Sequence, residues 1–193
     1  MATGDDGLVK IASYTGTTDI FTFSNLSGSP YYRGYKIVGS IQQSSSGTEY
    51  VKVHFNGDND HHVCVYSRTS NSSVSHGKQP ASGSGAGFAY IFNGAPGTSY
   101  SGFFTPITID IMGDPSNSAA TGYPQAKWLT YLTTSTSYSD IVHNYGGLAY
   151  QDIGSLDSIQ ISTGCYCNWS SGSRWDLYGY IGADDGDLFN GWG

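Results

Sequence analysis

A short segment near residue 56 holds four side chains with oxygen atoms, namely Asn56, Asp58, Asn59 and Asp60. Calcium takes about six to eight oxygen ligands and accepts flexible loops, so Asn56, Asp58 and Asp60 form a candidate calcium site. Their spacing differs from that of an EF-hand loop. Asn-Gly-Asp is also an ordinary turn sequence, in which glycine adopts positive φ and aspartate bonds nearby amides. A solvated turn is the simpler interpretation, and we predict no bound metal or cofactor.

The histidines and cysteines show no zinc-like spacing. His61 and His62 are adjacent, so in a strand they would point to opposite faces. Cys165 and Cys167 would share one face of an extended segment and could form a metal site with Cys64 or a histidine. Ordinary buried or loop thiols are the more common case.

The residues needed for catalysis do not occur in a recognisable arrangement. Serines are abundant, but none lies in a nucleophile elbow or beside an activating base. Asp58 with Asp60, or Asp184 with Asp185 and Asp187, could hydrolyse glycosides only if their carboxyl groups were separated across a cleft. Carboxylates that are neighbours in sequence are more often simply solvated. We therefore predict that the protein is not an enzyme.

Aromatic residues are the more informative surplus, at 15% of the chain. Several lie in or beside segments rich in glycine and serine, where a flat ring can stack on a sugar or on another protein. The alternative is that half or more of them pack in the core or at a subunit interface. We expect some to be exposed, and take as candidate ligand-binding residues Tyr31, Tyr32, Trp128, Tyr145 and Trp169.

Length and charge limit the class of protein. The chain has 193 residues, and lengths of about 100 to 200 residues usually form one domain. We predict a single domain over 1–193, with a short lead-in at 1–7 and a C-terminal extension at 182–193. The net charge is -7, from 8 Lys and Arg against 15 Asp and Glu, with no basic stripe. Nucleic acid is therefore a disfavoured partner.

Targeting signals are not evident. No apolar stretch approaches the roughly 18 residues of a membrane helix, and residues 1–30 lack the charged and then apolar pattern of a signal peptide. Three cysteines are too few for a disulfide framework. We expect synthesis in a reducing cytosol and no insertion into a membrane.

Alternation of apolar and polar residues predicts short half-buried strands. In one of them Val51, Val53 and Phe55 share a face, and Lys52 and His54 take the opposite, solvated face. The strands expected on this pattern are Ile20–Phe23, Tyr35–Ile41, Tyr50–Phe55, Val63–Tyr66, Ile107–Ile111 and Ser158–Ile161, with an earlier one beginning near Leu8.

The connections between these strands carry turn chemistry rather than helical patterns. Turns are expected at Asn93-Gly94, Gly113-Asp114-Pro115 and Asn144-Tyr145-Gly146-Gly147, and Asn71–Gly87 is the longest segment that resembles a surface loop. Eight or more short strands in one domain predict an all-β fold, an antiparallel β-sandwich of jelly-roll type.

Four segments also resemble, in order, the motifs of a family of tailed-bacteriophage virion proteins. They are Ile20–Leu26, Tyr35–Ser40, Val51–Asp58, and the closing pair Ser158–Ile161 and Gly172–Tyr180. The match covers about residues 18 to 181, and the order and spacing of the motifs carry it. Cys165-Tyr166-Cys167 and the extension after Gly182 depart from the family pattern.

This resemblance implies a jelly-roll structural protein displayed on the virion and made in the host cytoplasm. Its implied role is a tail, fibre or receptor-binding appendage, or alternatively a decoration protein of the head. The expected partners are other virion proteins, further copies in a homo-oligomer, and a host cell-surface glycan. A secreted carbohydrate-binding module is a further alternative, since such modules also tend to be aromatic-rich jelly rolls.

Overall fold

The computed structural model of the chain consists of β-strands joined by turns and loops, and no helix occurs in the part of the chain that it describes. That part comprises residues 7–27, 32–47, 49–58, 62–70, 73–79, 89–97, 104–112, 124–133, 141–150, 155–164 and 167–181. The strands are β1 (Leu8–Thr15), β2 (Ile20–Phe23), β3 (Tyr32–Ile41), β4 (Glu49–Phe55), β5 (His62–Ser70), β6 (Ser73–Gln79), β7 (Ala89–Ala95), β8 (Thr105–Met112), β9 (Gln125–Thr133), β10 (Ile141–Tyr150), β11 (Ile159–Thr163) and β12 (Arg174–Ile181).

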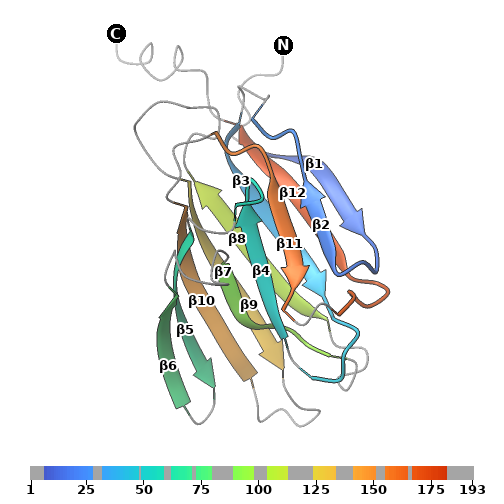
Figure 1. Ribbon diagram of the computed structural model, residues 1–193, viewed down its shortest axis with the longest axis vertical. Helices are drawn as coiled ribbons and strands as arrows, with labels where there is room; N and C mark the ends of the chain where they lie inside the picture. The colour runs from blue at the N-terminus through green and yellow to red at the C-terminus, as the bar shows by residue number, and fades with distance from the viewer. Residues whose placement is uncertain are drawn as a thin grey trace.

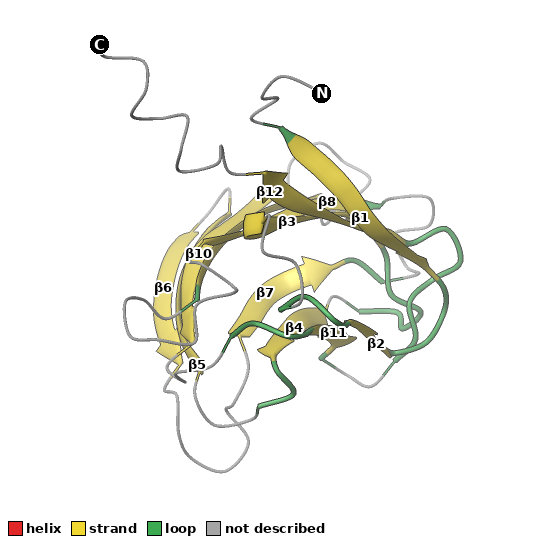
Figure 2. Ribbon diagram, turned by 90° about the horizontal axis from the view of Figure 1, so that it is seen from above, coloured by secondary structure: helices red, strands yellow, loops and turns green. Residues whose placement is uncertain are grey.

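The strands form two antiparallel sheets packed face to face. The large sheet has eight strands in the order β1-β12-β3-β8-β9-β10-β5-β6, and the small sheet has four in the order β2-β11-β4-β7. Figure 1 shows the small sheet lying across the large one, and Figure 2 shows the large sheet curving around it. The predicted all-β sandwich is confirmed.

The connectivity is that of a jelly roll. Four antiparallel pairs, β1 with β12, β2 with β11, β3 with β8 and β4 with β7, join strands from the two ends of the chain progressively towards its middle. They place β1-β12-β3-β8 in one sheet and β2-β11-β4-β7 in the other. These eight strands are the double Greek key of the fold.

Four additional strands enlarge one sheet only. The hairpin β5–β6 is inserted between β4 and β7, and the hairpin β9–β10 between β8 and β11. Together they continue the large sheet beyond β8 as β9-β10-β5-β6, with β6 at its edge. Figure 2 shows β5 and β6 at the side of the sandwich, beyond β7 of the small sheet.

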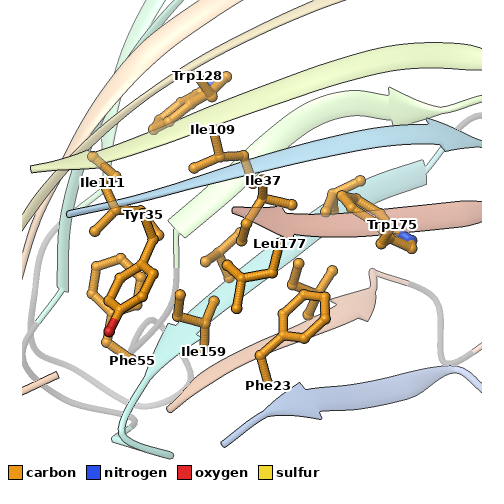
Figure 3. Packing of buried hydrophobic residues seen from close by; sticks show 14 of the residues in the cluster. Phe23, Tyr35, Ile37, Phe55, Ile109, Ile111, Trp128, Ile159, Trp175 and Leu177 are labelled. Carbon is orange, nitrogen blue, oxygen red and sulfur yellow. The ribbon is translucent and has the colours of Figure 1, made fainter. Parts of the chain in front are cut away.

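One continuous cluster of buried side chains fills the space between the sheets. The large sheet contributes residues such as Ile37, Ile109 and Trp175, and the small sheet contributes Phe55 and Ile159. Figure 3 shows these side chains interdigitating between the two layers. In β12 the side chains of Trp175 and Leu177 are fully buried, as the alternation in that segment predicts.

The sequence-based strand predictions are confirmed at the jelly-roll strands and wrong at parts of the insertions. Ile20–Phe23 is predicted to the residue, and the other expected strands fall within β3, β4, β5, β8 and β11, with a shift of one residue at Ser158. The expected turn at Asn144–Gly147 instead lies inside β10, and Asn93-Gly94 lies inside β7. Residues 73–79 of the expected loop form β6. The expected turn at Gly113–Pro115 and the whole extension 182–193 lie outside the described residues.

Candidate binding face

Two of the aromatic residues expected at a binding surface lie in the core instead. Trp128 is 4% exposed and Trp169 is 1% exposed. Trp128 points inward from β9, and Trp169 packs edge-on against Trp175 with ring centroids 5.3 Å apart. The prediction for these two tryptophans is corrected, because an indole buried between the sheets cannot stack on a surface ligand.

The three expected tyrosines have different positions. Tyr32 is half-buried, packs against the core and lies over Gly179. Tyr145 is 47% exposed on β10, as a ligand-binding ring requires. Tyr31 lies outside the described residues.

Tyr145 belongs to a row of three rings on the outer face of the large sheet. The ring of Tyr131 on β9 stacks on that of His143 on β10, with centroids 4.6 Å apart and planes 1° from parallel. His143 is in turn 5.5 Å from the ring of Tyr145. Tyr131 and Tyr145 are both 47% exposed. We call these three residues the ring row.

An open depression of about 370 Å³ lies beside the ring row, where β10, β5 and β6 adjoin. It is formed by Val65, Tyr66, Ser67, His76, Tyr145, Gly146 and Gly147. Its walls combine apolar carbon, an aromatic ring and hydrogen-bonding groups, which is the usual mixture in a small-molecule or sugar site.

Glycine occurs at the two positions 146 and 147 of this depression for different structural reasons. A Cβ at Gly146 would overlap the indole of Trp128 and the carbonyl oxygen of Val65, so the core requires glycine there. A Cβ at Gly147 would make only ordinary contacts, 3.7 Å from the Ala126 oxygen and 4.0 Å from Val65 Cγ2. Gly147 is therefore not needed for packing, and its missing side chain leaves the outer surface open.

Lysines flank this opening along a single row across the strands. Residues paired in register lie side by side on one face of a sheet. The pairing aligns Lys10, Tyr178, Lys36, Asp110, Lys127, Gly147, Val65 and Lys78 from β1 to β6. Lys127 alternates with the buried Ala126 and Trp128, so the row faces away from the core. We call it the lysine row.

Asp110 lies at the centre of the lysine row and bridges two of its cations. Its carboxylate oxygens are 3.3 Å from Lys36 Nζ and 3.9 Å from Lys127 Nζ. The hydroxyl of Tyr180 donates a hydrogen bond of 2.6 Å to Asp110. Burial and then this hydrogen bond raise the pKa of Tyr180 to about 12, so it remains a donor. One carboxylate is thus shared between two lysines.

Asp176 occupies a similar position in the neighbouring row. It accepts hydrogen bonds from Ser13 at 2.6 Å and from Arg174 Nε at 3.0 and 3.1 Å, and Lys10 Nζ is 2.8 Å away. Burial alone would raise its pKa, but the hydrogen bonds from Lys10, Ser13 and Arg174 outweigh burial and hold the pKa at about 2. Asp176 is therefore ionised, and two cations balance its negative charge.

The charges of the chain are divided unevenly between the large sheet and the rest. The eight strands of the large sheet contain seven of the eight Lys and Arg residues, all except Lys52, and only two of the fifteen Asp and Glu residues. These strands therefore carry five excess positive charges in a chain of net charge -7. The inserted strands β5, β6, β9 and β10 contain no carboxylate and three cations, namely Arg68, Lys78 and Lys127.

The candidate calcium turn has a structural role. Asn56 Oδ1 accepts hydrogen bonds from the amides of Asp157 and Ser158 at 2.8 and 3.1 Å, and its Nδ2 donates to the Ser155 carbonyl at 2.9 Å. Asp58 Oδ2 accepts from the Tyr150 hydroxyl at 3.2 Å. Asn56 Oδ1 and Asp58 Oδ2 are thus engaged by protein donors, and Asp60 lies outside the described residues.

The other candidate metal ligands are also not brought together. Cys64 is a buried thiol in β5 that forms no disulfide, whereas Cys167 is disulfide-bonded and is therefore not the ordinary thiol expected from the sequence. Cys165 and His61 lie outside the described residues, as do Asp184, Asp185 and Asp187. Within the described ranges no group of three or more His, Cys, Asp or Glu side chains could hold a metal ion. The same ranges contain no helix suited to spanning a membrane.

The outer face of the small sheet differs from the sequence-based expectation. Lys52 and His54 do point away from the core, as predicted, but they are only 7% and 9% exposed. Burial, followed by the charge of Lys52, lowers the pKa of His54 to about 4, with Asp58 acting in the opposite direction. Burial likewise lowers the pKa of Lys52. These positions are not solvated.

Sequence reasoning missed Tyr131, His143, Lys127 and Gly147 as surface residues. The signal was present, because Lys127, Leu129 and Tyr131 alternate with Trp128 and Thr130 as in a half-buried strand. The glycine pair 146–147 resembled a turn and concealed the second strand.

No family model, curated protein or solved structure matches the chain.

Proposed function

We propose that this protein is a non-enzymatic binding module displayed on the virion of a tailed bacteriophage, as a tail, fibre or receptor-binding appendage. The outer face of its large sheet is the surface that contacts the receptor. The observation that carries this proposal is the ring row of Tyr131, His143 and Tyr145, whose two tyrosines are exposed beside an open depression. The virion setting rests on the resemblance of the segments between residues 18 and 181.

The inserted hairpins support this choice of surface. The jelly roll is complete with eight strands, and β5, β6, β9 and β10 add nothing to its small sheet. What they add is area on one outer face, and that area holds the ring row and the depression. Large exposed rings that gather in one place are typical of contact surfaces.

Recognition through such a surface suits a repeated particle component. Stacking on two or three rings gives modest affinity for one site. Many copies on one particle raise the avidity without new contacts. A symmetric homo-oligomer is the expected arrangement of the copies.

Mass spectrometry of purified virions, followed by immunogold labelling, tests the virion setting. A stoichiometric signal located on the tail agrees with the proposal. A location on the head would identify a decoration protein instead. Absence from the particle, combined with glycan binding by the isolated protein, would favour a carbohydrate-binding module.

Competition for cell attachment tests the binding face itself. Purified protein should reduce adsorption of the phage to its host, and the double variant Tyr131→Ala/Tyr145→Ala should lose at least tenfold in potency. Tyr50→Ala is the matched control, because Tyr50 is also partly exposed but lies on the small sheet. Equal potency of the double variant and the wild-type protein would overturn this choice of surface.

A further inference from the structure

Resting on the proposed function, we infer that the ligand of this face is a polysaccharide with repeated anionic groups. It lies across the strands along the lysine row, with one sugar seated at Gly147 beside the ring of Tyr145. The segment of the row that it occupies runs from Lys36 through Asp110, Lys127, Gly147 and Val65 to Lys78.

Charge complementarity favours an anionic ligand. The strands of the large sheet carry seven cations and two carboxylates, whereas the chain as a whole is acidic. One of these cations, Arg68, is in register with the buried Asn144 and its Nε is buried, so it does not belong to the outer face. Both carboxylates, Asp110 and Asp176, are already paired with two cations each. Lys127 keeps a side chain that is 71% exposed, and Lys78 has no carboxylate partner among the described residues. This face therefore attracts negative charge, although the molecule as a whole repels it.

The spacing between the cations fits a ligand whose negative charges are widely separated. Adjacent strands are about 4.8 Å apart, so Lys36 and Lys127, two strands apart, are separated by about 10 Å. Lys127 and Lys78 are three strands apart, or about 14 Å. A nucleic-acid strand carries a phosphate about every 3.4 Å along the helix axis, a much denser array. A polysaccharide with one acid group in each repeat unit matches the sparse row better.

The opening at Gly147 provides the seat for a sugar ring. It separates Lys127 from Val65 in the lysine row, and no side chain fills it. Tyr145, two residues away on the same strand face, borders the same depression, and so does His76. A sugar placed there would stack on the tyrosine ring and hydrogen-bond with the imidazole, while the lysines on either side pair with its acid groups.

A glycine substitution separates this inference from a general effect of charge. Gly147→Gln fills the opening without changing the charge, and the contacts of Gly147 leave room for the fold to accept it. Gly47→Gln is the matched control, because a Cβ at Gly47 would meet nothing within 4 Å and Gly47 lies in the loop between β3 and β4. Circular dichroism and thermal melting establish that both variants are folded.

Titration calorimetry with polygalacturonate, hyaluronan, dextran sulfate and neutral dextran gives the test. The wild-type protein should bind at least one of the three acidic polymers and not dextran, and added salt should weaken the binding. Gly147→Gln should weaken it at least tenfold and Gly47→Gln less than twofold. Lys127→Gln and Lys78→Gln should each weaken it about three- to tenfold.

Several results would overturn the inference. They are binding of none of the three acidic polymers, equal binding of neutral dextran, full binding by Gly147→Gln, or equally tight binding of single-stranded DNA. Suppose that none of the four polymers binds, but that Tyr131→Ala/Tyr145→Ala still competes less well than the wild-type protein for phage adsorption to the host. The proposed function then stands, and the inference of an acidic polysaccharide ligand fails. If the acidic polymer binds but the double variant competes fully, the attachment role fails and the polysaccharide site stands.

Discussion

Gly146 and Trp128 face each other across β10 and β9, and the indole occupies the space that a side chain at position 146 would need. Gly147, the next residue, points to the opposite face, where its Cβ would meet nothing closer than 3.7 Å. One glycine of the pair thus serves the core, and the other leaves the outer surface open. This division links the packing of the sandwich to its candidate site.

The two glycines should respond in opposite ways to alanine. Gly146→Ala should reduce the free energy of unfolding by about 2 to 3 kcal/mol, because it overpacks a full core. Gly147→Ala should leave it unchanged or raise it by up to about 1 kcal/mol, because alanine restricts the unfolded chain. Urea denaturation of both variants measures the difference. Equal effects at the two positions would contradict the assignment of their roles.

The jelly-roll strands were predictable from the sequence because each alternates cleanly between the two environments. Trp175, Leu177 and Gly179 face the core and Asp176 and Tyr178 face outward, as the period of two requires. The fold class follows from such segments. The pairing of β1 with β12 depends on contacts between distant parts of the chain, which local patterns do not encode.

The candidate site was less predictable, because tertiary packing overrides local composition there. The Asn144–Gly147 segment has the composition of a turn, yet it is a strand because Gly146 admits Trp128. β6 lacks a clear apolar pattern because its side chains with described environments are exposed or half-exposed. Trp169 lies in a polar segment of the sequence, but the isolated bridge of Trp169 to Gln43 places it against the core.

Asn56 should stabilise the protein, because its side chain connects the end of β4 to the segment that precedes β11 by hydrogen bonds. Asn56→Ala removes three hydrogen bonds and places alanine at φ 56°, where asparagine is better tolerated. We expect a loss of about 3 kcal/mol in the free energy of unfolding. Asn56→Asp keeps the accepting oxygens and should lose only about 1 kcal/mol. A loss below about 0.5 kcal/mol for Asn56→Ala would show that these hydrogen bonds are not needed for stability.

Chelation should not affect the protein. Asn56 Oδ1 and Asp58 Oδ2 accept hydrogen bonds from protein donors, so calcium would have to displace these bonds to bind in the described part of this turn. Melting temperatures measured with EDTA and with excess calcium should agree within about 1 °C, because a ligand that does not bind the native state cannot stabilise it. A lower melting temperature in EDTA that calcium restores would contradict this interpretation.

His54 should make the protein less stable as the pH falls from about 6.5 to about 4. Its pKa is about 4 in the folded chain, against an ordinary value of 6.5. In that range the unfolded chain takes up a proton that the folded chain does not, so the free energy of unfolding decreases with falling pH. His54→Gln should flatten this part of the curve of unfolding free energy against pH. An unchanged slope in the variant would assign the pH dependence to other groups.

The most direct measurement is a map of amide chemical-shift changes in isotope-labelled protein on titration with a short hyaluronan oligosaccharide, which carries one acid group in each disaccharide repeat. The largest changes should fall at Lys127, Tyr145 and Gly147, with smaller changes extending along the lysine row. Residues on the outer face of the small sheet, such as Thr22 and Gln160, should not respond. Changes confined to the small sheet, or none at saturating ligand, would contradict the claim that the enlarged sheet is the binding face for an acidic polysaccharide.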